Sequence, residues 1–221
     1  MSRDYILNKI KSQINSDVSD ENRRAAVAKR IADHDTGVLP AMPKTKIKQV
    51  NRFIEKVKAS QATVEQVSRK NLATAIAEYL RGYNLPNEIR MGSDERLNVI
   101  RTGGTKSLVI KDGKSDGQDL VGVSHAEGGI TETGTLALFS GKENPTTLNF
   151  LPENHIVVLS EKDVSNHYED VWAVIRKRYG AGNMPRSMNF ITGPSRSADI
   201  EQTLLLGAHG PIRLHVLLTR E

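Results

Sequence analysis

The sequence contains no cysteine among its 221 residues, and this absence excludes several kinds of chemistry. A chain without thiols forms no disulfide, has no cysteine nucleophile and supplies no thiolate to zinc or to an iron–sulfur cluster. Long hydrophobic runs are also missing: segments such as 156–159 and 216–218 are short. A membrane-spanning helix needs ~20 apolar residues, so we expect no membrane association.

Aromatic residues are scarce as well, with one Trp, five Tyr and four Phe. The core must therefore be built mainly from Leu, Ile, Val and Ala. The N-terminal segment MSRDYILNKIKSQ lacks an apolar stretch before a small-residue cleavage site, so we expect no signal peptide and a cytoplasmic location. A content of 38% hydrophobic and 26% charged residues is typical of a folded chain rather than a disordered one.

The positive charge is distributed unevenly along the chain. The formal net charge is +5, yet residues 1–60 carry 13 basic and 7 acidic side chains, whereas residues 61–221 carry 18 and 19. A nucleic-acid-binding domain normally gathers Lys and Arg on its folded body, so nucleic acid is not the partner that we expect. The basic residues of segment 44–60 indicate either a solvated helix face or a docking surface for an acidic partner.

Hydrophobic periodicity predicts an α/β fold with a largely parallel sheet. Helices are expected over 3–15, 44–60, 68–81, 163–179 and 197–206, and residues 16–43 read as a polar arm that can form a helix with few buried positions. Strands are expected over 63–64, 87–91, 107–111, 118–123, 135–139, 155–160, 188–192 and 212–218. We therefore predict a basic helical N-terminal extension over 1–60 and an α/β domain over 61–221.

Segment 188–218 carries the first candidate site. A strand over 188–192 leads into the turn Gly193-Pro-Ser195, and a helix is expected to follow. A strand, a glycine turn and a helix at the carboxyl end of a sheet form a common ligand site, and Arg196 favours an anion there. Asp199 and Glu201 would repel an anion, so the spacing by itself favours the alternative, in which these residues only cap and solvate the helix.

Segment 120–139 carries the second candidate site. Three threonine hydroxyls and the Glu132 carboxylate lie between two predicted strands. They could hold a polar ligand, with Glu132 as a general base or a covalent carboxylate. A glycine-permitted turn with threonines as strand formers is the alternative. The six histidines form no i,i+4 pair, so no metal site is expected, and His209 in a Gly-Pro turn is the histidine expected to face a cleft.

Several motifs in the second half of the chain resemble the LUD-domain family. They are Ile130-Thr-Glu-Thr-Gly-Thr-Leu136, Thr192-Gly-Pro-Ser-Arg-Ser-Ala-Asp-Ile-Glu201, Leu206-Gly-Ala-His-Gly-Pro211 and Leu214-His-Val216. Their order and length make the resemblance specific. It implies a three-layer Rossmann-like sheet similar to the NagB/RpiA/CoA-transferase superfamily, preceded by a helical extension.

The resemblance also implies a function. The chain would belong to a bacterial system that oxidises L-lactate to pyruvate together with two iron–sulfur proteins. Iron–sulfur clusters would lie in those partners, and no cofactor is expected in this chain. The alternative is a stand-alone superfamily enzyme that acts on a phosphorylated sugar or a CoA thioester. Whether this chain catalyses a step by itself stays open, because the family transfers no catalytic residue; Glu132 is a candidate through superfamily analogy only.

The two motifs are expected to line one cleft at the carboxyl edge of the sheet, where a small carboxylate could bind. The candidate ligand-binding residues are Thr131, Glu132, Thr133, Gly134, Thr135, Gly193, Ser195, Arg196, Asp199, Glu201 and His209.

Overall fold

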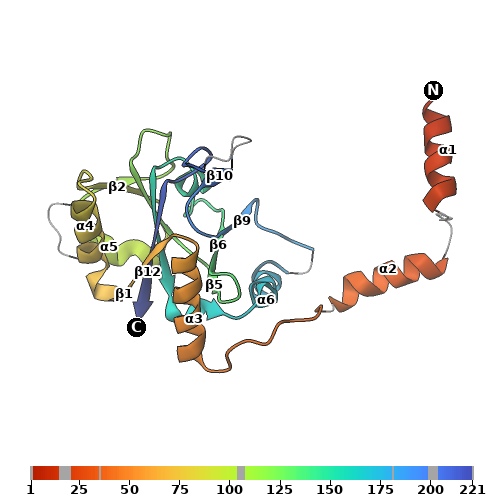
Figure 1. The fold of residues 1–221 in the computed structure, drawn as a ribbon, viewed down its shortest axis with the longest axis horizontal. Helices are drawn as coiled ribbons and strands as arrows, with labels where there is room; N and C mark the ends of the chain where they lie inside the picture. Colours follow the sequence, from red (N-terminus) through yellow and green to blue (C-terminus); the bar gives the residue numbers. More distant parts are fainter. Residues whose placement is uncertain are drawn as a thin grey trace. The chain divides into compact units, whose positions relative to one another are not determined.

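The computed structural model describes residues 2–14, 21–34, 36–103, 108–180, 182–198 and 204–220. The chain forms two compact units, residues 1–40 and residues 41–221. The first unit contains helices α1 (Arg3–Ile14) and α2 (Glu21–Asp33) (Figure 1). The helix predicted over 3–15 is thus confirmed. Within the predicted polar arm, α2 is a helix without a buried residue.

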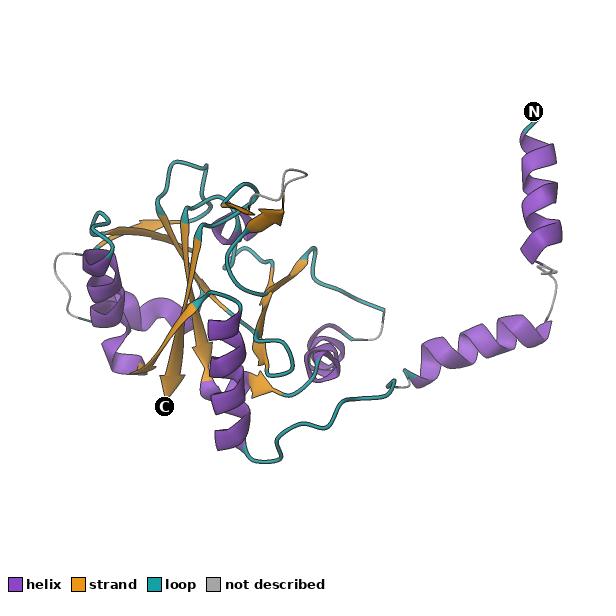
Figure 2. Cartoon of the chain, viewed as in Figure 1, coloured by secondary structure: helices purple, strands orange, loops and turns teal. Residues whose placement is uncertain are grey.

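A six-stranded parallel sheet forms the centre of the second unit (Figure 2). Its strands are β1 (Thr63–Ser68), β2 (Glu88–Met91), β3 (Val109–Asp112), β4 (Val121–His125), β7 (Asn154–Ser160) and β12 (Arg213–Arg220). They lie in the order β1-β12-β7-β4-β2-β3, and every neighbouring pair is parallel. This arrangement confirms the predicted α/β class with a largely parallel sheet.

Strand β7 is buried over its whole length, so its side chains serve two hydrophobic cores. On one face of the sheet, Ile156 and Val158 pack with apolar residues of α4 (Leu72–Gly82) and α5 (Asn98–Thr102). On the other face, Val157 and Leu159 pack with residues of α3 (Lys46–Ala59). Successive side chains of a strand point to opposite faces, which is why an uninterrupted apolar run is needed at this central position.

The second face of the parallel sheet is also covered by a smaller mixed sheet (Figure 1). Its strands lie in the order β8 (Val164–Ser165), β5 (Gly128–Ile130), β6 (Thr135–Phe139) and β9 (Met188–Ile191). Helix α6 (Tyr168–Tyr179) packs on this small sheet through Val171 and Ile175. The described part of the unit also contains short 3-10 turns at Arg69–Asn71, Glu95–Leu97, Thr146–Asn149 and Glu161–Asp163.

Helix α3 belongs to the second unit, although it precedes the domain boundary predicted at residue 60. Its Val50, Phe53 and Val57 are at most 4% exposed and face the core. A helix that buries one apolar stripe in this way is held by tertiary packing. Within the described residues, no helix is both long and apolar enough to cross a bilayer.

The prediction of a helix over 197–206 is wrong. Residues Arg196–Ala198 form β10, which pairs antiparallel with β11 (Leu204–Leu206), and Gly207 N donates to Ser195 O to close the pair. The backbone hydrogen bonds of residues 196–198 and 204–206 are made between the two strands. Two of the candidate residues, Asp199 and Glu201, lie outside the described residues.

The helix predicted over 163–179 begins later, at Tyr168. Val164 and Ser165 form strand β8 instead and pair with β5. His167 N then donates to the Asp170 carboxylate at the start of the helix, a capping contact that sets where the helix begins.

Candidate functional site

The chain leaves the carboxyl ends of β2 and β4 toward opposite faces of the parallel sheet. The two strands are neighbours in the parallel sheet. After β2 the chain turns into α5 on one face, whereas after β4 it enters β5 on the other face. Such a switch point opens a crevice in α/β sheets, and ligands bind there.

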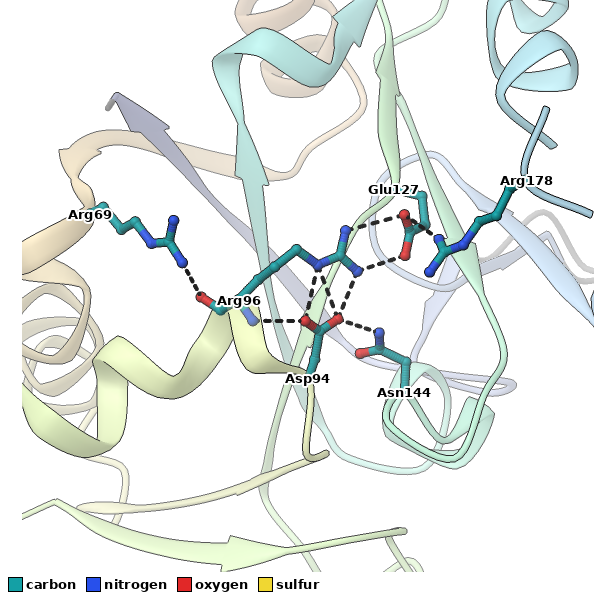
Figure 3. Close-up of polar contacts among 6 residues, drawn as sticks. All are labelled: Arg69, Asp94, Arg96, Glu127, Asn144 and Arg178. Carbon is teal, nitrogen blue, oxygen red and sulfur yellow. Dashed lines mark hydrogen bonds and ion pairs between the residues drawn. The ribbon is translucent and has the colours of Figure 1, made fainter.

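The Arg96 side chain joins residues that follow these two strands (Figure 3). Arg96 Nε and Nη2 donate to the Asp94 carboxylate at 2.9 and 2.7 Å. Its Nη2 and Nη1 donate to the Glu127 carboxylate at 2.6 and 3.1 Å. Asp94 follows β2 and Glu127 follows β4, so one guanidinium joins the ends of two strands. These contacts use four of the five N–H groups that an arginine side chain carries.

Three further residues surround this bridge (Figure 3). Arg178 of α6 donates to Glu127 at 2.8 Å, and Asn144 Nδ2 donates to Asp94 at 2.6 Å. Arg69, which follows β1, donates to the Arg96 carbonyl at 3.5 Å. The cluster therefore connects the parallel sheet to the helix that covers the small sheet.

The charges in the cluster hold one another in the ionised state. Burial alone would raise the pKa of Asp94, but hydrogen bonds from Arg96 outweigh burial and lower it to about 2. Burial would also raise the pKa of Glu127, but Arg96 and Arg178 outweigh burial and lower it. The two carboxylates raise the pKa of Arg96 against the effect of its burial. At neutral pH these groups transfer no proton, and they act as a charged brace.

Two recesses open beside the brace, and both have walls of mixed charge. A recess of about 50 Å³ is lined by Arg69, Arg96, His125, Lys162 and Asp163, among others. Burial, aided by the charge of Arg96, lowers the pKa of His125 to about 4, so its ring is neutral at pH 7.

The neighbouring recess of about 440 Å³ is lined by Lys46, Glu127, Lys162, Asp163 and Asp170, among others. Both cations and carboxylates line this recess, as they do the smaller one. The larger recess therefore favours no single charge sign, whereas three cations and one carboxylate line the smaller one among the described residues.

Four of the candidate residues line a third cavity, of about 270 Å³, at the opposite end of the sheet. They are Gly193, Ser195, Arg196 and His209. The prediction that they lie at the carboxyl edge is wrong. The His209 turn precedes β12, and the cavity wall also includes His155 near the start of β7, so the cavity lies at the amino ends of these strands.

The other candidate segment, 130–135, meets the first one without lining that cavity. Thr135 Oγ1 lies 2.6 Å from Thr133 Oγ1 and 2.6 Å from Thr192 Oγ1. The Tyr168 hydroxyl lies 3.0 Å from both Thr133 and Thr135. Four hydroxyl groups from the two segments and α6 thus form one hydrogen-bonded cluster.

The remaining residues of segment 130–135 have structural partners. Thr131 is fully buried and donates to the Gln49 carbonyl in α3 at 3.3 Å. Glu132 is one-third exposed, and its carboxylate lies 3.3 Å from His167 Nδ1. Neither residue lines the cavity that Arg196 and His209 share.

Gly134 and Gly193 occupy equivalent structural positions. Both have positive φ, 73° and 75°, and both lie against the end of α3. A Cβ on Gly134 would lie 2.6 Å from the Val57 nitrogen, and one on Gly193 would lie 2.2 Å from the Ser60 carbonyl oxygen. The glycines in both motifs therefore let two turns contact α3 closely, which accounts for them without a ligand.

Sequence reasoning missed the brace of Asp94, Arg96 and Glu127, together with His155 in the cavity wall. A usable signal was present for the carboxylates, because Asp94 and Glu127 each follow closely on a strand of the parallel sheet. Polar residues in that position of parallel strands gather at one edge of the sheet. Among the described residues, no group of three or more His, Asp or Glu side chains is placed to hold a metal ion.

The fold and its recesses define an α/β protein with ligand-sized openings at both ends of a parallel sheet. Residues 50–219 match the sequence pattern of the LUD domain, and the chain therefore belongs to the LUD-domain family.

Several curated relatives are called lactate utilization protein C. The one from Shouchella clausii is 28% identical over 169 residues, covering 72% of this chain and 73% of that protein. The one from Bacillus subtilis is 31% identical over 138 residues, covering 53% and 58%. The one from Geobacillus sp. (strain WCH70) is 37% identical over 94 residues, so the match spans 42% of this chain and only 39% of that protein's length.

A solved structure shares the fold. The crystal structure of a DUF162 family protein from Deinococcus radiodurans superposes with a TM-score of 0.59 and covers 80% of this chain and 100% of that chain. The sequence identity is 19%, so the likeness concerns the fold alone.

Proposed function

We propose that this chain is a component of a bacterial lactate-utilization system that oxidises L-lactate to pyruvate. The observation that supports the proposal is the match to relatives called lactate utilization protein C, two of which align with 72% and 74% of this chain. Membership of the LUD-domain family adds to this support, because the family match runs from residue 50, within α3, to residue 219, within β12.

The oxidation of L-lactate to pyruvate releases two electrons and two protons, so an electron acceptor is required. This chain has no cysteine and cannot hold an iron–sulfur cluster through thiolates. We place the clusters in two partner proteins, and this chain contributes binding or positioning of the small carboxylate. In this role the chain holds no cofactor and catalyses no step by itself.

The basic face of α3 is the surface that we assign to partner docking. Lys48, Lys56 and Lys58 are exposed on this helix, whereas Lys46 is engaged, because its Nζ donates to the Lys162 and Val164 carbonyls. An acidic surface on a partner would be attracted to such a face. Charge reversal at Lys48 and Lys58 should slow association with the partner proteins and leave folding intact.

Gene deletion tests the physiological role directly. A deletion strain of the host should lose growth on L-lactate as sole carbon source and keep growth on pyruvate, and the intact gene supplied on a plasmid should restore it. Growth on L-lactate without the gene, in a strain freed of other lactate dehydrogenases, would refute the role.

Co-purification tests the partners. A tagged chain should retain two iron–sulfur proteins, recognised by their visible absorption and by iron analysis. The chain alone should show no lactate oxidation with an artificial electron acceptor, and the reconstituted complex should show it. Full activity of the isolated chain would show instead that it is a stand-alone enzyme.

A further inference from the structure

The cavity of about 270 Å³ at the amino ends of β7 and β12 differs from the other two recesses in its charge. No acidic side chain lines it among the described residues, whereas Arg196 and His209 do. Its apolar wall includes Phe150, Phe190 and Pro194. Such a cavity, with an apolar body and a few polar groups, is the usual form of a small-molecule site.

Asn149 is a further polar residue of this wall, and a buried relay sets its orientation. Ser124 Oγ donates to Asn149 Oδ1 at 3.0 Å, and His155 Nε2 lies 3.1 Å from Ser124 Oγ. The three side chains are at most 5% exposed. Because the single Ser124 proton is given to Asn149, Ser124 accepts its second hydrogen bond from the N–H of His155 Nε2.

The opposite arrangement, in which Ser124 Oγ donates to His155 Nε2, is less favourable. It would leave a proton on His155 Nδ1, which is buried and has no partner among the described residues. A buried N–H without an acceptor is rarer than a buried acceptor without a donor. Burial lowers the pKa of His155 to about 3, so the ring is neutral at pH 7 and one of its two nitrogens carries no proton.

The orientation of the relay decides what Asn149 offers to the cavity. Its Oδ1 is used by Ser124, and its Nδ2 makes no hydrogen bond to a described residue. Asn149 therefore presents an NH2 donor, to which Arg196 adds a permanent cation. A ligand that fits these donors is an acceptor with negative charge, and a carboxylate has both properties.

We propose that this cavity binds a small monocarboxylate with a short apolar body, whose carboxylate is held by Arg196 and Asn149. Ser124 and His155 are positioning residues, because they act through Asn149. The inference rests on the proposed function for the choice of L-lactate and pyruvate as probes. The donor set of the cavity is an independent observation.

Isothermal titration of the full chain at pH 7 with L-lactate, pyruvate and propionate tests the proposal. At least one of the three should bind in a one-to-one ratio. Lactamide, which has the size of lactate but no charge, should bind at least about tenfold more weakly, because a hydrogen bond to a charged group is lost.

Two variants locate the site. Asn149→Asp keeps an oxygen for Ser124 and replaces the NH2 donor by a second carboxylate oxygen, so carboxylate binding should fall at least tenfold. Arg196→Gln changes an exposed side chain and should cause a similar loss. Arg176→Gln, at an exposed position of α6 that does not line the cavity, is the matched control and should bind as the unchanged chain does.

The outcomes separate this proposal from the role in lactate utilization. If none of the three carboxylates binds at 10 mM, or if both cavity variants bind as tightly as the Arg176→Gln control, the cavity is not a carboxylate site. If growth on L-lactate still depends on the gene, the role in lactate utilization remains supported even though the cavity does not bind a carboxylate. Should Asn149→Asp fail to fold, judged by its circular dichroism, Arg196→Gln decides.

Discussion

Arg96 is the residue whose removal the structure predicts to be most costly at the carboxyl edge. The substitution Arg96→Met keeps much of the length of the side chain and removes the guanidinium shared by Asp94 and Glu127. The Asp94 side chain is 5% exposed and that of Glu127 is 10% exposed, so two carboxylates would stay buried with fewer partners. Leaving a buried charge unpaired costs ~3–5 kcal/mol.

The pKa of Asp94 gives a second measure of the same contact. A shift from 3.8 to about 2 corresponds to about 2 kcal/mol of folding stability at neutral pH. Arg96 is one-third exposed, and Arg178 and Asn144 remain as partners. We therefore expect the free energy of unfolding to fall by about 3 kcal/mol at pH 7, the lower end of the range for a buried pair.

The effect should depend on pH in a defined direction. Because the pKa of Asp94 is lower in the folded chain, its contribution is complete above about pH 4 and disappears as the pH falls through about 2. In Arg96→Met, burial should instead raise the pKa of Asp94. Acid then protonates this carboxylate and removes the unpaired buried charge, so the variant loses less stability at low pH than the unchanged chain does. The difference in stability between the two chains should shrink by roughly half between pH 7 and pH 3.

Urea unfolding followed by the fluorescence of Trp172, the single tryptophan, measures this difference. Arg101→Met is the matched control, because Arg101 pairs with Asp112 at the surface and such pairs contribute less than ~1 kcal/mol. A loss below about 1 kcal/mol for Arg96→Met at pH 7, or a loss that is the same at pH 7 and pH 3, would refute the brace as described.

Three further substitutions test the two motifs. Gly193→Ala places a Cβ 2.2 Å from a backbone oxygen at positive φ, so thermal unfolding should show a loss of ~2 kcal/mol or more; Gly182→Ala, with positive φ but open space, should lose less, and equal losses would contradict the close contact. Thr135→Val removes a hydroxyl with three hydroxyl partners and should cost ~1–3 kcal/mol in urea unfolding, whereas an unchanged midpoint would show that the cluster does not stabilise the fold. Glu132→Gln should preserve growth on L-lactate, because the partly buried Glu132 pairs with His167 and lines none of the cavities described above; loss of growth with a folded chain would make Glu132 a catalytic carboxylate.

Local patterns predicted the elements best where packing and local preference agree. The apolar run at 135–139 is strand β6, and the spacing of Val50, Phe53 and Val57 is that of α3. The helix expected over 197–206 failed because strand pairing with Leu204–Leu206 satisfies the same backbone. Local preference cannot decide between these states when both satisfy the hydrogen bonds.

The candidate site was predicted only in part for a related reason. Residues close in sequence, such as Gly193, Ser195 and Arg196, do line one cavity. Of the distant partners, His155 reaches that cavity because β7 and β12 are neighbours, and Asn149 because the turn before β7 contacts Ser124 of β4. The brace likewise depends on the pairing of β2 with β4, which skips β3 in the chain. No periodicity within a segment reports which strands become neighbours.

The sequence by itself determined what this chain cannot do and which family it belongs to. The absence of cysteine excludes thiolate-bound clusters, and two long motifs identify the LUD domain. Only the tertiary structure decided at which end of the sheet each motif lies and which charges meet there. The physical reason is that strand order and direction arise from long-range packing of buried faces, whereas composition and motifs are properties of the chain before it folds.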